Sequence, residues 1–202
     1  MKPISAIKAV VFAAALVPAA ALVHGFYTND LTANPLDYIT KQTGWWALAF
    51  LVITLTVTPI RRITGWNQII RLRRMLGLFA FFYGLLHLLT WVVLINFFDL
   101  QTMVEDVAKR PFITIGMATF LILLALAMTS NKWALRRLGR RWQSLHRLVY
   151  IAAIGAVVHF WWLVKADITE PRRWAFGVAG LLGLRVWWAW RKNQVRPTAA
   201  VR

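Results

Sequence analysis

Residues 71–98 read RLRRMLGLFAFFYGLLHLLTWVVLINFF, a cluster of arginines followed by an apolar run from Met75 to Phe98. A helix needs about 20 apolar residues to cross the hydrocarbon core of a bilayer. This run has that length, and it contains no Lys, Arg, Asp or Glu and a single histidine, His87. It therefore predicts a membrane-spanning helix that carries a candidate functional residue.

Five further segments have the same character, and the composition agrees with a membrane protein. Of the 202 residues, 59% are apolar and 15% are charged, whereas soluble domains carry about 25% charged residues. The absence of cysteine excludes disulfides, iron–sulfur clusters and cysteine nucleophiles. We expect an all-α integral membrane protein in which residues 1–202 form one domain of six transmembrane helices. The expected spans are Ile4–Phe26, Gly44–Ile60, Met75–Phe98, Phe112–Thr129, Leu145–Val164 and Trp174–Trp190.

The charges along the chain indicate how these helices are oriented. Lys and Arg number 24 against 7 Asp and Glu, and 18 of the 24 basic residues lie on one side of the expected spans, which holds no acid. Short loops rich in Lys and Arg stay in the cytoplasm, so both termini are expected to be cytoplasmic. The loops on the other side hold all the acids, which are Asp30, Asp37, Asp99, Glu105, Asp106, Asp167 and Glu170.

The first segment admits a second interpretation. Lys2 and Lys8 precede a run rich in Ala and Val that leads to Ala19, Ala20 and Ala21, a pattern that secretory signal peptides share. Cleavage there would leave five spans and would break the agreement between span number and charge. We therefore favour a retained first transmembrane helix.

Histidines supply most of the ionisable side chains expected inside the membrane, since no Asp or Glu lies in a predicted span. His87 lies on the third helix, and His146 and His159 lie on the fifth. Counted from the inner ends of their helices at about 1.5 Å per residue, His87 and His159 reach depths that agree within about 3 Å. His146 lies about 20 Å closer to the cytoplasm.

Two imidazoles from facing helices can bind a haem iron from both sides, each through one ring nitrogen. A histidine can also simply bond a polar group of a neighbouring helix. Three buried histidines at two depths favour cofactor binding. The spacing does not decide the matter, because the 13 residues between His146 and His159 correspond to about 3.6 turns, so the two do not share a face of an ideal helix.

Three motifs connect the chain with a known family. The stretches VTPIRR (57–62), RLRRMLGLFAFFYGLLH (71–87) and LGRRWQSLHRLVYIAAIGAVVH (138–159) resemble MsrQ/YedZ, the haem-binding membrane subunits of periplasmic methionine-sulfoxide reductase systems. That family belongs to the ferric-reductase-like transmembrane domains, which include the NADPH oxidases. The resemblance implies a b-type haem electron carrier of the bacterial inner membrane, rather than the catalytic subunit. It also implies bound FMN, a quinone or cytosolic flavin reductase as donor, and a periplasmic molybdenum-dependent partner that repairs oxidised methionine.

The resemblance implies that His87, His146 and His159 are cofactor-binding iron ligands. In the NADPH oxidases the third and fifth helices each carry two histidines, whereas here Arg74 stands 13 residues before His87. We therefore expect one haem on His87 and His159, while a second haem at His146 would need an unusual ligand. Arg73 and Arg74 either set the topology or pair with a haem propionate or a flavin phosphate.

Other functions stay open: a cytochrome b subunit of another oxidoreductase, or a cofactor-free transporter or assembly partner. Transporters often contain inverted repeats and broken helices, but we see no clear repeat here. Pro18 interrupts a span, while Pro59 is expected at a helix end, where it is harmless. Gly177, Gly180 and Gly183 are expected to pack closely against another helix.

Partners are expected on both sides of the membrane. The glycines of the sixth span do not form a strand–turn–helix dinucleotide loop, so electrons are expected from quinol or from a separate reductase. On the acidic side, loops 27–43 and 99–110 are the expected docking surface of the periplasmic partner.

Overall fold

The computed structural model describes residues 3–164 and 166–194, and all regular structure within those ranges is helical. Two elements are not α-helical: η1 is a 3₁₀ segment before α3, and η2 is a π-helical turn that continues α3. The elements are α1 (Pro3–Tyr27), α2 (Pro35–Thr64), η1 (Asn67–Leu72), α3 (Arg73–Leu89), η2 (Thr90–Ile95), α4 (Leu100–Lys109), α5 (Pro111–Met128), α6 (Lys132–Leu138), α7 (Arg140–His146), α8 (Leu148–Leu163) and α9 (Thr169–Gln194).

Five helical segments are long and apolar enough to cross a membrane, and they correspond to the first five expected spans. An all-α membrane protein is therefore confirmed. The sixth expected span lies inside α9, a 26-residue helix that is not one of the five and that carries several arginines. The five segments are Ile4–Tyr27, Pro35–Thr64, Asn67–Ile95, Pro111–Met128 and Arg140–Leu163.

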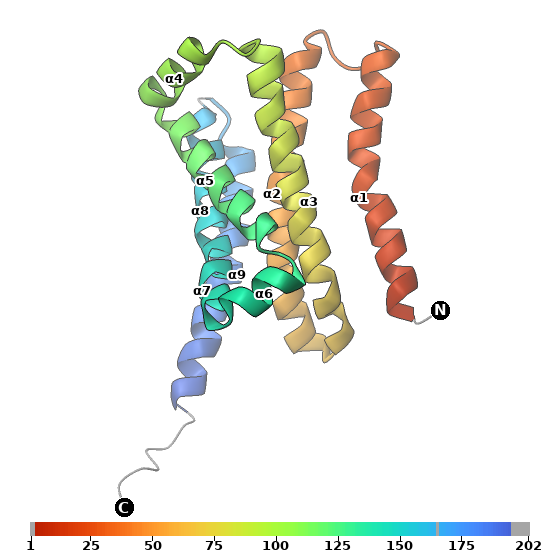
Figure 1. The fold of residues 1–202 in the computed structure, drawn as a ribbon, viewed down its shortest axis with the longest axis vertical. Helices are drawn as coiled ribbons and strands as arrows, with labels where there is room; N and C mark the ends of the chain where they lie inside the picture. Colours follow the sequence, from red (N-terminus) through yellow and green to blue (C-terminus); the bar gives the residue numbers. More distant parts are fainter. Residues whose placement is uncertain (1–2, 165, 195–202) are drawn as a thin grey trace, which may run out of the picture.

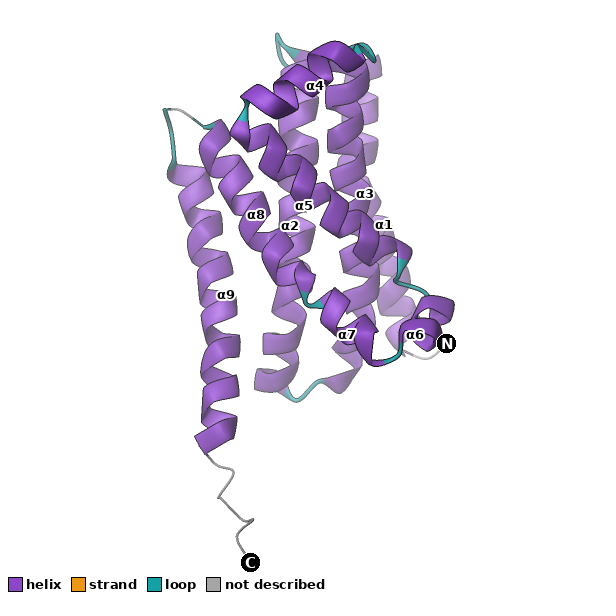
Figure 2. Ribbon diagram, turned by 60° about the vertical axis from the view of Figure 1, so that its left-hand side comes forward, coloured by secondary structure: helices purple, strands orange, loops and turns teal. Residues whose placement is uncertain are grey.

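The long helices run alongside one another between two ends of the molecule (Figure 1). α2 packs against α3 and α5 packs against α8, while α9 contacts α8 and α2. α1 lies at the edge of the bundle (Figure 1). We call the end with the acidic connections before α2, α5 and α9 the outer end. The opposite end, with η1, α6 and α7, is the inner end (Figure 2).

A buried tyrosine ties α1 to the bundle. The Tyr83 hydroxyl of α3 donates to the Ala15 carbonyl at 2.7 Å and accepts from the Ala19 N–H at 3.1 Å. In a regular helical turn those two backbone groups bond to each other, and Pro18 lies in the same turn of α1. The Tyr83 ring stacks on Phe50 of α2, with centroids 5.4 Å apart. One side chain thus joins three helices.

Pro59 lies inside α2, so the expectation that it ends a helix is wrong. Proline has no N–H, which leaves the carbonyl four residues earlier, that of Leu55, without its helical partner. Arg185 of α9 supplies that partner: its Nη2 donates to the Leu55 carbonyl, and its Nη1 donates to the Leu181 carbonyl at 2.8 Å. The guanidinium carbon also lies 5.4 Å from the centre of the Tyr150 ring. The gap in α2 therefore becomes an attachment point for α9.

The glycines of α9 do not make the expected close helix contact. A Cβ on Gly177, Gly180 or Gly183 would meet no atom of the described chain within 4 Å. The three glycines line an open apolar groove of about 680 Å³ that Val52 of α2 and Trp187 of α9 also border. The predicted packing is therefore wrong within this chain, and Arg185 supplies a polar contact between α9 and α2 instead.

We expect Arg185→Met to lower the free energy of unfolding by about 1–3 kcal/mol, because the Leu55 carbonyl would lose its donor in apolar surroundings. Pro59→Ala places an N–H four residues after Leu55, where it can bond that carbonyl. Arg185→Met should therefore lower the free energy of unfolding by less in protein that also carries Pro59→Ala. Unfolding by a denaturing detergent in mixed micelles measures both costs.

Arg191→Met is the matched control on the same helix, since the Arg191 guanidinium lies over Trp187, 5.5 Å from the ring centre. Its effect should be the same with and without Pro59→Ala, because separate sites add. An equal cost of Arg185→Met in both backgrounds would contradict the role given to the Leu55 contact.

Candidate functional site

Two predicted site residues, His87 on α3 and His159 on α8, come together towards the outer end of the bundle. Their ring centroids lie 6.1 Å apart, and the ring planes meet at 77°. Both residues are half-buried among the helices. The similar depth predicted for this pair is therefore confirmed.

Each of these imidazoles is held by a backbone carbonyl near the outer end of a neighbouring helix. His87 Nδ1 donates to the Thr40 carbonyl of α2 at 2.9 Å, and His159 Nδ1 donates to the Phe112 carbonyl of α5 at 2.6 Å. A carbonyl only accepts, so the proton of each neutral ring lies on Nδ1 and the Nε2 lone pair is free. Such a bond fixes the ring orientation and the nitrogen that can bind a metal.

Glycines allow both rings to approach the neighbouring helix this closely. A Cβ on Gly44 would lie 3.1 Å from His87 Nδ1, and a Cβ on Gly116 would lie 2.7 Å from His159 Nδ1. The second distance is well inside van der Waals contact. Any larger residue at Gly116 would therefore have to displace the His159 ring.

The same arrangement occurs twice in the chain. In each copy the residue that supplies the carbonyl, Thr40 or Phe112, comes first. The glycine lies four residues after that residue, and the histidine lies 47 residues after that same residue. The copies sit on α2 with α3 and on α5 with α8, the two most extensively packed helix pairs. The two glycines and the two carbonyls are not among the residues expected from the sequence. The shared spacing to each histidine is the signal that could have identified them.

A second group of predicted residues lines a cavity of about 520 Å³ at the inner end. Arg73, Arg74 and His146 border it, together with Lys132 and Arg147. Apolar residues of α2, α5 and α8 complete its walls, and no Asp or Glu is among the described residues that line it. Four basic side chains beside apolar walls create a positive potential that favours an anionic ligand.

His146 is oriented differently from the outer pair. Its Nε2 lies 3.1 Å from Thr129 Oγ1, and the Thr129 hydroxyl donates to the Ala125 carbonyl at 2.7 Å. Nε2 is therefore the donor in this contact, which leaves Nδ1 of the neutral ring free. The ring also stacks on Trp142, with centroids 3.9 Å apart.

The structure thus separates the predicted residues into two sites. His87 and His159 form the outer pair, while His146 and Arg74 border the inner cavity. Arg74 and His146 occupy matching positions, each 13 residues before the outer histidine of its segment. The inner site therefore combines a guanidinium with an imidazole, whereas the outer site combines two imidazoles.

Sequence comparisons relate the chain to one group of proteins. Residues 43–157 match the family described as ferric reductase like transmembrane component. The chain is 50% identical over 193 residues to the protein-methionine-sulfoxide reductase haem-binding subunit MsrQ of Ralstonia nicotianae, a match that covers 94% of this chain and 89% of the relative. MsrQ of Azospira oryzae is 49% identical over 98% of this chain and 85% of the relative. No solved structure matches the chain.

A haem held by His87 and His159 would be lost from most of the purified Gly116→Ala protein, because the added methyl group would lie 2.7 Å from His159 Nδ1. Gly44→Ala should cause a smaller loss, since the corresponding approach to His87 is 3.1 Å. The dithionite-reduced minus oxidised spectrum measures the haem, and circular dichroism verifies that the helices have formed.

Gly84→Ala on α3 is the matched control, because its Cβ would meet Leu123 at an ordinary 3.8 Å. Its haem content should equal that of the parent. Parental haem content in folded Gly116→Ala protein would contradict the role of the close glycine contact.

Proposed function

Because the chain belongs to the MsrQ family of haem-binding reductase subunits, within the ferric reductase-like transmembrane components, we propose that it carries electrons across the bacterial inner membrane for methionine-sulfoxide reduction. Its electrons would come from the quinone pool or from a cytosolic flavin reductase. They would pass to a periplasmic molybdenum-dependent catalytic subunit. The observation that carries the proposal is the outer histidine pair.

The outer pair fits a b-type haem that His87 and His159 would hold through their Nε2 atoms. Imidazole nitrogens bind metal ions such as zinc at about 2 Å, so two imidazoles that share one metal ion have ring centres up to about 6 Å apart. The observed separation is 6.1 Å. The Nδ1 atoms of both rings are already committed to carbonyls, so both Nε2 atoms are available as ligands.

A bound haem would supply a one-electron carrier, and the residues around it would set its reduction potential. The Thr40 and Phe112 carbonyls raise the basicity of the ligating nitrogens and stop the rings from rotating. The close contacts at Gly44 and Gly116 hold each ring against its helix. These residues therefore prepare the ligand geometry in advance.

The inner cavity fits an anionic group, either the phosphate of FMN or the propionate of a second haem. Arg73 and Arg74 supply planar donors that suit bidentate recognition of such anions. A second haem in the inner cavity would have only one imidazole ligand, that of His146. The matching position before His87 holds Arg74, which has no imidazole to offer. We therefore propose one firmly bound haem at the outer pair and assign the inner cavity to anion recognition.

The charge distribution supports a cytoplasmic inner end. Basic side chains surround the inner cavity, and the acidic connections lie at the outer end. Positively charged loops stay in the cytoplasm, and this rule supports our proposal that α9 is a sixth span and that both termini are cytoplasmic. The hydrogen bond from Arg185 to the Leu55 carbonyl supports a membrane position for α9, because it satisfies a backbone group inside the bundle.

Replacing His87 or His159 with Ala should abolish the b-type difference spectrum of the detergent-purified protein, because each substitution removes one of the two imidazoles that would hold the haem. His146→Ala should keep the spectrum of the outer haem. The amount of haem per polypeptide, measured as the pyridine haemochromogen, compares the variants.

His24→Ala is the control for these substitutions, since His24 is an exposed residue near the outer end of α1. It should leave the spectrum unchanged. A colourless parent protein would remove the electron-carrier proposal, and complete loss of the spectrum in His146→Ala would move the haem away from the outer pair.

Arg74→Ala should reduce the bound anionic cofactor by about tenfold or more at limiting concentration, because a hydrogen bond to a charged group contributes about 1.5–3 kcal/mol. Acid extraction followed by flavin fluorescence, together with haem quantification, measures both candidates. Arg71→Ala is the matched control, since Arg71 is an exposed arginine of η1 outside the cavity lining. Unchanged flavin and haem content in Arg74→Ala protein would refute the assignment.

A further inference from the structure

The short helix α4 has no part in either site, yet its sequence LQTMVEDVAK is strongly two-sided. Asp99 caps its start by accepting from the N–H groups of Gln101 at 3.0 Å and Thr102 at 3.3 Å. The Thr102 hydroxyl bonds the same carboxyl and lowers its pKa, which keeps the cap charged. α4 lies across the outer end of the bundle, at a large angle to the spanning helices (Figures 1 and 2).

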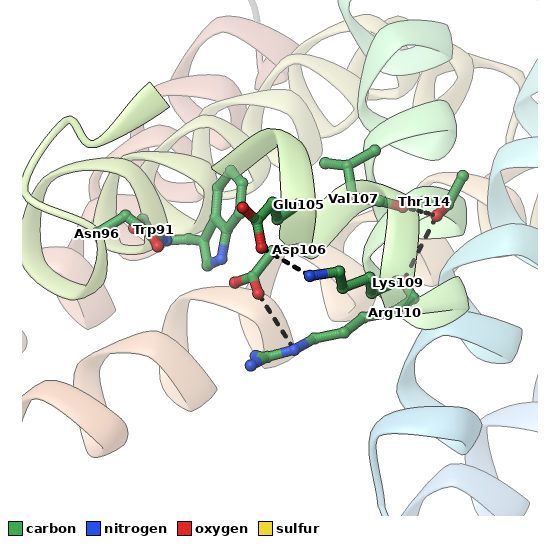
Figure 3. Close-up of polar contacts among 8 residues, drawn as sticks. All are labelled: Trp91, Asn96, Glu105, Asp106, Val107, Lys109, Arg110 and Thr114. Atoms are coloured by element: carbon green, nitrogen blue, oxygen red, sulfur yellow. Dashed lines mark hydrogen bonds and ion pairs between the residues drawn. The ribbon is translucent and has the colours of Figure 1, made fainter. Parts of the chain in front are cut away.

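One side of α4 rests on the protein. Met103 and Val107 are half-buried, and the Thr114 hydroxyl of α5 donates to the Val107 carbonyl at 2.5 Å (Figure 3). Asp106 is mostly buried and pairs with Arg110 at 3.2 Å. These contacts fix how α4 is rotated about its own axis.

A second side of α4 is apolar and uncovered. Leu100, Val104 and Ala108 follow one another at intervals of four residues, so they form one row along the helix. Leu100 is 73% exposed and Val104 is 68% exposed. The next row is polar and contains Glu105 and Lys109, which form an ion pair at 2.7 Å (Figure 3).

The turn before α4 adds two exposed aromatic rings. Phe97 and Phe98 are 78% and 65% exposed. Both have left-handed backbone conformations, with φ of 48° and 63°, which bulky residues rarely adopt. The turn is held by Asn96, whose backbone N–H and side-chain Nδ2 both donate to the Trp91 carbonyl at 3.0 Å. The chain thus keeps a strained turn that leaves both rings uncovered.

The exposed apolar residues follow a membrane span directly in the sequence. Leu89 and Ile95 belong to the span Asn67–Ile95 and are themselves exposed on its surface. Phe97 and Phe98 follow directly, and Leu100 and Val104 come next. Side chains just beyond the end of a span lie at the level of the lipid headgroups, where aromatic and aliphatic residues anchor amphipathic helices.

We propose that α4 is an interfacial helix that inserts Leu100, Val104, Phe97 and Phe98 into the headgroup boundary of the outer leaflet. Met103 and Val107 rest on the bundle, the apolar row overhangs into lipid, and the Glu105–Lys109 row faces water. The occupant of this surface is the lipid bilayer itself. The proposal does not depend on haem or on the reductase partner.

The position of α4 matters to the outer site if the proposed function holds. α4 leads through Arg110 and Pro111 directly into Phe112, whose carbonyl orients His159. The hydrogen bond from the Thr114 hydroxyl to the Val107 carbonyl fixes the angle between α4 and α5. If α4 is anchored in the membrane, it therefore sets the depth of the start of α5, where the Phe112 carbonyl orients His159.

Single-cysteine labelling tests the proposal directly, because the chain contains no cysteine. Leu100→Cys, Val104→Cys and the matched control Glu105→Cys would each be labelled with the fluorophore NBD. The proteins would be placed in vesicles of phosphatidylethanolamine and phosphatidylglycerol. Quenching by nitroxide-labelled lipid would be compared with quenching by aqueous iodide, and circular dichroism would verify folding without reference to haem.

We expect the labels at positions 100 and 104 to emit at shorter wavelength and to be quenched by the lipid nitroxide. The label at position 105 should be quenched by iodide. Iodide quenching at all three positions would place the apolar row in water and overturn the proposal. Protection of positions 100 and 104 from both quenchers would also overturn it, because the row would then be covered by protein.

Discussion

A bilayer offers no water to a backbone carbonyl or a polar side chain, so each such group inside it must find a partner within the protein. In this bundle the partners are polar side chains that reach a backbone group of another helix. Where Pro59 leaves the Leu55 carbonyl without its helical donor, Arg185 of α9 supplies one. Where a histidine needs a fixed orientation, a helical carbonyl accepts its proton. The four contacts are Tyr83 to Ala15, Arg185 to Leu55, His87 to Thr40 and His159 to Phe112.

The two histidine contacts turn this general rule into a site. Because each Nδ1 is committed to a carbonyl, Nε2 is the nitrogen of each ring that can bind a metal. The arrangement is duplicated on the helix pairs α2 with α3 and α5 with α8. The two copies differ at one position: the residue 13 before the outer histidine is Arg74 in the first copy and His146 in the second. That difference separates an outer site with two imidazoles from an inner cavity dominated by positive charge.

The two ends of the molecule meet the membrane in different ways. At the inner end, basic side chains surround a cavity with apolar walls, and α6 and α7 close part of it. At the outer end, the acidic side chains of α4 pair with Lys109 and Arg110, and an apolar row of the helix is left uncovered. The inner end is thus built to attract an anion, while the outer end neutralises its own charges and presents apolar side chains.

Local properties of the sequence determined the all-α class, the first five spans, and the choice of His87, His159, His146 and Arg74. Apolar runs and charge can be read from near neighbours in the chain. The sequence did not determine α4, the π-helical turn or the attachment of α9, and it misjudged Pro59 and the packing of the α9 glycines. Only the tertiary structure decided these features, because they depend on which helices are neighbours. Arg185 meets Leu55 across 130 residues, and each outer histidine meets its carbonyl across 47. Residues that are neighbours in the sequence do not indicate which carbonyl lacks a donor or which imidazole nitrogen is free.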